Sequence, residues 1–122
     1  MESRATRERA RRNRIELRLH ADATERQHRE LGAFVRFCVF RIERELGESE
    51  RWVVIVAPGS AGFRSTVTVH DGPLALQTTG TGLDGALAVW DALCRLEQAL
   101  REGRSARIGR PRRDPTEQFD RG

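Results

Sequence analysis

The clearest pattern of hydrophobic and polar residues lies between residues 63 and 100. Apolar and polar side chains alternate over 63–70, which is the period of a half-buried β-strand. Asp71 and Gly72 favour a tight turn, and the alternation resumes over 74–78. These residues predict a β-hairpin with one apolar face.

A helical pattern begins after this hairpin at Asp84, which is a suitable N-cap residue. Apolar residues then recur at helical spacing over four turns, at Val89, Ala92, Leu93, Leu96 and Leu100. Gly109 and Pro111 prevent a further long element downstream. The pattern predicts an amphipathic helix from Asp84 to about Arg104.

The residues upstream predict the partners of this hairpin and helix. Alternation over 14–20 indicates a first strand, and the β-branched run 51–56 indicates a central strand that is buried on both faces. Between them, a long helix is expected from Asp22 or Thr24 to about Leu46. Its apolar stripe contains Leu31, Val35, Cys38, Ile42 and Leu46, and is widened by Phe34, Phe37 and Phe40.

This order of elements predicts an α+β fold. We expect a β-α-β-β-β-α sandwich, in which two helices pack on one face of a four-stranded, mostly antiparallel sheet. The chain divides into a basic flexible arm over 1–13, the folded domain over 14–104, and a basic tail containing Pro and Gly over 105–122.

The basic charge is concentrated at the two ends of the chain. All 22 basic residues are arginine, and the formal net charge is +4. Residues 1–14 carry +4 and residues 101–122 carry +3, whereas residues 15–100 carry −3. Basic arms on a compact body are typical of nucleic-acid-binding proteins, because arginine pairs bidentately with phosphate. Solubility alone would also explain such arms.

No set of residues forms a recognisable catalytic or metal-binding motif. The three histidines lack metal-ligand spacing and are expected to be solvated surface residues: His20, His28 and His70. Residues 80–85 spell G-x-G-x-x-G, but a dinucleotide site would need a further parallel strand and an acidic residue after the helix. We expect a strand-to-helix turn there, and we predict no enzymatic activity, metal, cofactor or small-molecule substrate.

The cysteines and apolar runs indicate an intracellular protein. Cys38 and Cys94 lie in apolar helical patterns and are expected to be reduced and buried. The longest apolar run, 52–57, is too short to span a membrane, and the charged N-terminus differs from a signal peptide. The sequence therefore predicts a soluble cytoplasmic protein with no membrane partner.

Three stretches of the chain carry a resemblance to a known family. In GTGLDGALAVWDALCRLEQALREGR, an acidic residue opens the last helix and basic residues end it. The other two stretches are the hairpin TVTVHDGPLAL and the passage RIERELGESERWVVIV, which runs from the end of the first helix into the second strand. In these stretches the chain resembles the N-terminal, ribosome-binding domain of the ribosome hibernation-promoting factor and ribosome-associated inhibitor family, in its short form. The resemblance covers about residues 14–104.

The resemblance implies a ribosome-associated, RNA-binding protein that docks on the small ribosomal subunit near the decoding centre. There it would contact ribosomal RNA, exclude messenger and transfer RNA, and so inhibit translation or promote ribosome hibernation under stress. The positions that match the family's basic sites are Arg41, Arg95, Arg101 and Arg104. The cluster of arginines in the tail adds Arg107 as a candidate RNA contact.

Other hypotheses about the function remain open at this point. Cys38 stands where the family often has a basic residue, and Trp90 where it usually has an acidic one. A protein-interaction module without ribosome binding would use Trp52 or Trp90 at an apolar contact. A double-stranded RNA-binding domain is disfavoured, because residues 83–86 at the start of the last helix are acidic rather than basic. The oligomeric state is left open.

Overall fold

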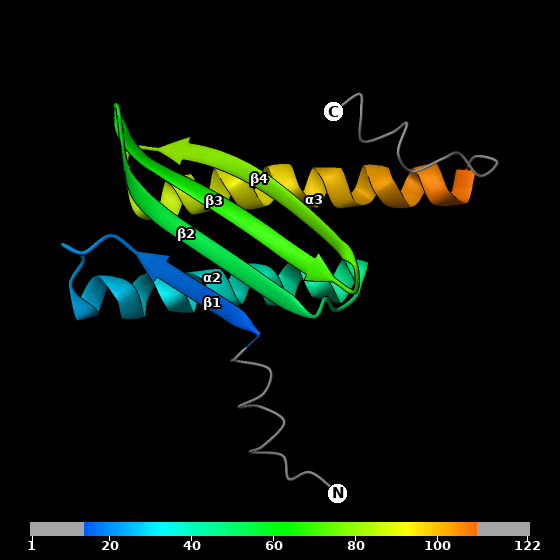
Figure 1. Cartoon of the computed structure of the whole chain (residues 1–122), viewed down its shortest axis with the longest axis horizontal. Coiled ribbons are helices and arrows are strands. Elements are labelled where there is room, and N and C mark those ends of the chain that lie inside the picture. The colour runs from blue at the N-terminus through cyan, green and yellow to red at the C-terminus, as the bar shows by residue number, and fades with distance from the viewer. Residues whose placement is uncertain (1–13, 110–122) are drawn as a thin grey trace, which may run out of the picture.

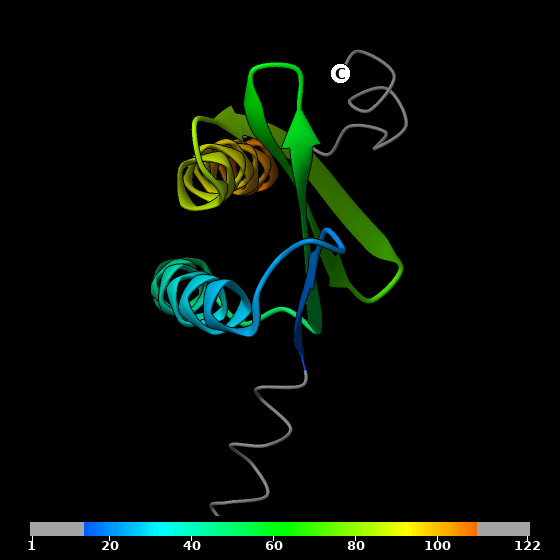
Figure 2. The same ribbon diagram turned by 90° about the vertical axis from the view of Figure 1, so that its left-hand side faces the viewer.

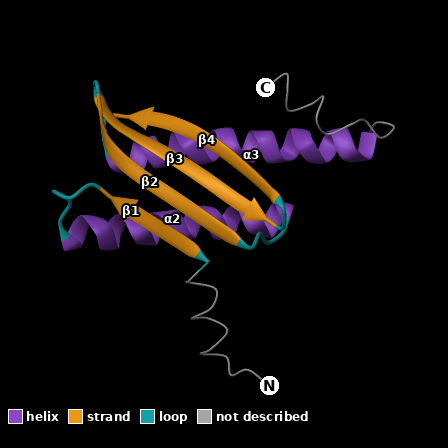
Figure 3. Ribbon diagram, viewed as in Figure 1, coloured by secondary structure: helices purple, strands orange, loops and turns teal. Residues whose placement is uncertain are grey.

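A computed structural model describes residues 14–109, with side chains up to residue 103. The elements are β1 (Ile15–Leu19), α2 (Glu25–Leu46), β2 (Arg51–Gly59), β3 (Gly62–Asp71), β4 (Leu74–Gly82) and α3 (Gly85–Gly109), shown in Figure 3. The predicted β-α-β-β-β-α order and α+β class are confirmed. The expected arm over 1–13 and tail residues 110–122 lie outside the described residues.

The four strands form one sheet in the order β1-β2-β3-β4 (Figure 1). β1 pairs with β2 in parallel, and the other two pairings are antiparallel. Both helices cover the same face of this sheet, and the opposite face has no covering element among residues 14–109 (Figure 2). The expected two-layer arrangement is therefore confirmed.

The core lies between the helices and the covered face of the sheet. Leu17, Val54, Val67 and Thr78 are in register across the four strands and point toward the helices. The buried apolar residues of the helices that meet this face include Val35, Val39, Ile42, Val89, Ala92, Leu93 and Leu96. Period-2 strands and two helical stripes thus bury one continuous cluster, as their sequence patterns predicted.

Several residues that were expected in the core lie at the surface. Phe37 is 67% exposed, because it lies about 200° around α2 from the buried Val35 and Val39. Cys94 is exposed on α3, whereas Cys38 is buried as predicted. Ile55 is 38% exposed, because it faces the uncovered side of the sheet; β2 is therefore not fully buried on both faces.

Two further expectations are corrected. His20 and His70 are half-buried rather than solvated, and the His20 ring lies 5.7 Å from that of Phe63. α3 continues to Gly109 instead of ending near Arg104, because the first residue that is incompatible with a helix is Pro111. Within the described residues, neither helix combines the length and the apolar character needed to cross a membrane.

The helix and turn signals work as the sequence predicted. Thr24 caps α2 and forms a reciprocal capping box with Gln27. Asp84 caps α3 by accepting a hydrogen bond from the Leu87 backbone N–H at 2.8 Å. Gly47 ends α2 with φ 99°, and Gly72 turns the β3-β4 hairpin with φ 63°.

One buried carboxylate joins β1, α2 and β2. The Glu43 side chain is 5% exposed and accepts hydrogen bonds from Arg14 at 2.9 and 3.0 Å. It also accepts the Ser49 backbone N–H and the Trp52 indole N–H, each at 3.0 Å. Burial alone would raise the pKa of Glu43, but these donors outweigh it and hold the pKa below its usual range.

Replacing Glu43 by Gln is expected to lower the free energy of unfolding by about 3 kcal/mol. This is the lower end for a broken buried ion pair, because Arg14 keeps partial access to water. The wild-type contribution is present above the ordinary pKa of 4.5 and is lost as the pH falls through the folded-state pKa. Urea unfolding of the wild type and the variant, at a pH above 4.5 and at a pH below the folded-state pKa, measures both effects.

The matched control is Glu16→Gln, because Glu16 pairs with Arg18 and Arg51 on the uncovered face, where water screens the interaction. Its loss of stability should be much smaller. Equal losses in the two variants would contradict the role given to Glu43.

Candidate nucleic-acid interface on the helix layer

The two helices run parallel because of the strand order. β1 and β4 point in the same direction, since β1 is parallel to β2 and two antiparallel pairings follow. Each of these strands is followed by a helix that returns across the same face, as Figure 1 shows. α2 and α3 therefore lie side by side in parallel and meet along one line, which we call the seam.

Three contacts across the seam share a sequence offset of 56 residues. The rings of Phe34, near the middle of α2, and Trp90, in the second turn of α3, lie 6.3 Å apart. Farther along, Arg41 pairs with Glu97, and Arg101 pairs with Glu45. The seam is thus apolar in its first half and ionic in its second.

Two glycines in β4 allow α3 to lie directly on the sheet. A Cβ atom at Gly80 would lie 2.2 Å from the Ala92 backbone nitrogen, and one at Gly82 would lie 2.6 Å from the Ala88 nitrogen. The Thr78 hydroxyl donates a hydrogen bond to the Ala92 carbonyl at 2.7 Å. The G-x-G part of the sequence motif is thus explained by close strand-to-helix packing within β4 rather than by a turn.

Replacing Gly80 by Ala should destabilise the fold by about 3 kcal/mol, the upper end for overpacking, because the new methyl group meets helix backbone. Gly103→Ala is the matched control. No atom lies within 4 Å of a Cβ at Gly103, so this change inside α3 should stabilise the protein by about 0.5–1 kcal/mol. Thermal unfolding midpoints compare the two, and equal midpoints would contradict the packing role.

The predicted RNA-binding residues Arg41 and Arg101 are ion-paired within the chain. Arg41 lies 3.2 Å from Glu97, and Arg101 lies 2.7 Å from the same carboxylate and also contacts Glu45. Hydrogen bonding by Arg101, followed by the charge of Arg41, keeps the pKa of Glu97 below its usual range. Both arginines therefore hold the two helices together, a role that the sequence pattern did not predict.

The predicted residues on the rest of α3 are placed differently. Arg95 is exposed and lies 3.3 Å from Asp91, one turn earlier. Asp91 also accepts the Thr81 backbone N–H at 3.0 Å, and this hydrogen bond is the main reason for its lowered pKa. Arg104 and Arg107 belong to the last turns of α3, and their side chains lie outside the described part of the structure.

Four exposed arginines that the sequence did not single out have no ion pair or hydrogen bond among the described residues: Arg29, Arg36, Arg44 and Arg64. Arg29 and Arg36 are seven residues apart and therefore lie on the same side of α2. Arg64 belongs to β3, and its strand register puts it on the uncovered face. Arg36 has no acidic residue three or four positions away, a signal that could have identified it.

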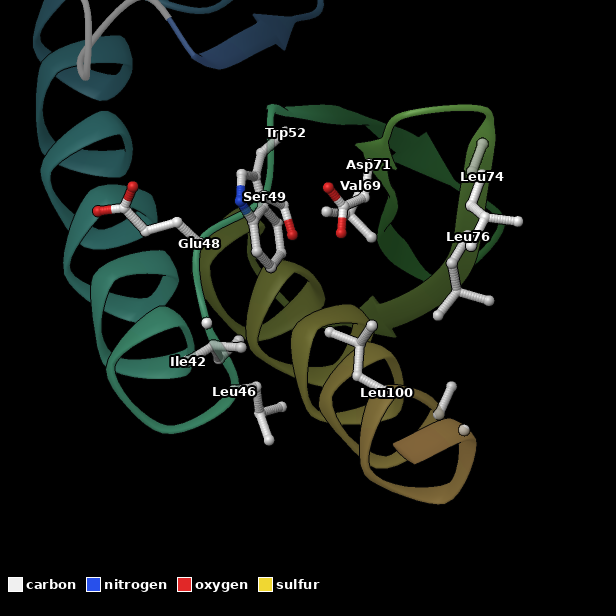
Figure 4. A pocket seen from close by; sticks show the side chains of 14 residues that line it. Ile42, Leu46, Glu48, Ser49, Trp52, Val69, Asp71, Leu74, Leu76 and Leu100 are labelled. Carbon is white, nitrogen blue, oxygen red and sulfur yellow. The ribbon is translucent and has the colours of Figure 1, made fainter. Parts of the chain in front are cut away.

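A cavity of about 270 Å³ opens beside the C-terminus of α2. In Figure 4, Ile42, Trp52, Leu74, Leu76 and Leu100 surround it. Its lining is mainly apolar. Across the described residues, no three histidine, cysteine or acidic side chains come together in a way that could hold a metal ion.

Comparison with solved structures identifies the fold. The chain is similar to the N-terminal domain of Protein Y from Thermus thermophilus, with a TM-score of 0.57 and 17% identity over 72% of this chain and 94% of that one. It is also similar to a ribosomal subunit interface protein from Coxiella burnetii, with a TM-score of 0.59 and 16% identity over 75% and 97% of the two chains. The sequence matches no protein-family model and no curated protein sequence.

These similarities confirm the predicted resemblance at the level of the fold. They span nearly all of both solved chains, so the whole α+β domain is shared rather than one supersecondary unit. At 16–17% identity, the residues of the surface are largely this chain's own.

Proposed function

We propose that this protein is a cytoplasmic, ribosome-associated RNA-binding protein that acts by docking on the small subunit rather than by catalysis. By occupying ribosomal RNA there, it would inhibit translation or promote ribosome hibernation. The observation that carries this proposal is the complete domain fold shared with a ribosomal subunit interface protein. Such a role requires no chemical reaction on a substrate.

The distribution of charge supports an RNA partner. Arg29, Arg36 and Arg44 on α2 leave their guanidinium groups free of ion pairs within the described residues. Arginine is the side chain best suited to phosphate, because its planar fork donates two parallel hydrogen bonds. The basic residues of 1–14 and 101–122 add positive charge at both ends of the sequence. Such contacts position a protein on RNA without reading its sequence.

The site residues fall into two groups in this proposal. Arg95, Arg104 and Arg107 on α3 would contact phosphates directly. Arg41 and Arg101 would hold α2 and α3 in register, with only part of their donor capacity left for RNA. Affinity would then depend more on the arginines outside the seam than on those within it.

Co-sedimentation of the full chain with small subunits and whole ribosomes tests the function at low and moderate salt. Saturable binding is expected, with an affinity that falls as salt rises. The Arg36→Gln variant should reduce the log-log salt slope by about 0.7–0.9, which corresponds to one phosphate contact. Arg64→Gln removes an equally free arginine from the uncovered sheet face and should leave the slope unchanged.

Absence of saturable binding by the wild-type chain would contradict the proposal. The protein-interaction module would then be the better reading, because exposed Phe37 and Trp90 offer an apolar contact.

A second pair of variants tests whether Glu97 withholds the seam arginines from RNA. Glu97→Gln releases Arg41 and leaves Arg101 paired with Glu45 alone, so it should tighten RNA binding and steepen the salt slope by about 0.7–0.9 for each arginine that gains a phosphate. Glu102→Gln changes the net charge equally, but Glu102 accepts a hydrogen bond only from Gln98 among the described residues. Binding that rises equally in both variants would indicate general electrostatics and contradict the seam account.

A further inference from the structure

Three aromatic side chains form an exposed ledge over the first half of the seam. Phe34 and Phe37 come from α2, and Trp90 comes from α3 across the seam. The rings of Phe34 and Trp90 are 6.3 Å apart with planes inclined by 41°. Phe37 is 67% exposed and Trp90 is 44% exposed. We call these three residues the aromatic ledge.

The ledge continues into a groove of about 360 Å³ at the N-terminal ends of both helices. Phe34 belongs to both features, since it lines the groove and contacts Trp90. The groove walls also include Leu31, Phe63 and His20. Planar and apolar surface therefore extends from the seam into a recess, although Leu31, Phe34 and Phe63 also pack against the core.

A cation is built into the ledge. The Arg41 guanidinium lies over the Trp90 ring, with its central carbon 5.8 Å from the ring centroid. The ion pair to Glu97 holds this guanidinium in place from the other side. Aromatic rings next to arginine are the combination on which unpaired bases stack in single-stranded RNA sites.

Charge beside the ledge favours RNA over a protein partner. Arg36 directly precedes Phe37 and points about 100° away from it around α2. Arg36 has no partner among the described residues, and Arg29 lies two turns earlier on the same side of the helix. The Arg36 guanidinium lies over Gly32 on the β1 side of α2, so an RNA strand with a base on Phe37 would reach it by continuing across the exposed face of α2.

We propose that the aromatic ledge is a stacking site for unpaired RNA bases, with Arg36 contacting a phosphate farther along the same strand. The inference rests on the proposed function and deepens it, because it specifies single-stranded or looped-out RNA as the element that this face recognises. Duplex RNA keeps its bases stacked internally and offers nothing to the ledge.

The two tryptophans make a direct test available. Trp52 is fully buried and hydrogen-bonded to Glu43, so quenching by added RNA reports on Trp90. Titration of the full chain with a single-stranded oligoribonucleotide should quench this fluorescence saturably. A duplex of the same length at the same ionic strength should leave it unchanged. Equal quenching by both, or by neither, would overturn the proposal.

Substitution by leucine separates stacking from simple apolar contact. Trp90→Leu and Phe37→Leu keep an apolar side chain but remove the ring, so single-strand affinity measured with a labelled oligonucleotide should fall about tenfold. Trp90→Phe should restore most of it. Leu74→Ala, an exposed apolar residue outside the seam, is the control and should bind as wild type. Thermal unfolding checks that each variant is folded.

Ribosome co-sedimentation of the same variants distinguishes the two proposals. Wild-type binding that Trp90→Leu retains in full would overturn the ledge inference and leave the proposed function standing. Selective quenching by single strands in a chain that does not bind ribosomes would support the ledge and overturn the ribosomal function. A partner protein at this face would tolerate leucine, and that result also counts against the ledge.

Discussion

The arrangement of the helix layer depends on the direct contact between the backbone of α3 and strand β4. Gly80 and Gly82 remove the side chains that would keep the helix away, and Thr78 anchors it by a hydrogen bond to the Ala92 carbonyl. With α3 held at this depth, its register against α2 is determined. The aromatic and ionic contacts of the seam all follow from that one register.

The ion pairs of the seam also determine which arginines are available to bind RNA. Arginines on amphipathic helices are ordinarily regarded as a surface available to ligands, yet Arg41 and Arg101 are engaged by Glu97 and Glu45. Exposed ion pairs contribute little to stability one by one, but linked pairs that join two elements restrict their relative position. The arginines left free on α2 then carry the electrostatic part of binding, together with the basic ends of the chain.

The elements and their inward faces were predictable because they depend on local periodicity and on caps. Val35 and Val89 fall on helical stripes, and Thr24 and Asp84 are recognisable caps. Phe37 was misassigned even though helical spacing places it about 200° from Val35 and Val39, opposite the buried stripe. Partnerships such as Arg41 with Glu97 join residues 56 positions apart, and no pattern within one helix reveals them. Arg29 and Arg44 were missed for the same reason, since freedom from a partner is a property of the assembled layer; the lack of an acidic residue three or four positions from Arg36 was a local signal for that arginine.

A reconstruction of the protein bound to the small ribosomal subunit, at a resolution that shows side chains, tests the central claim most directly. The account predicts that the layer of α2 and α3 faces RNA, that the Arg41–Glu97 ion pair persists, and that a base lies against Trp90. A complex in which the uncovered face of the sheet meets the RNA, or in which Arg41 and Arg101 have left their carboxylates for phosphates, would contradict it.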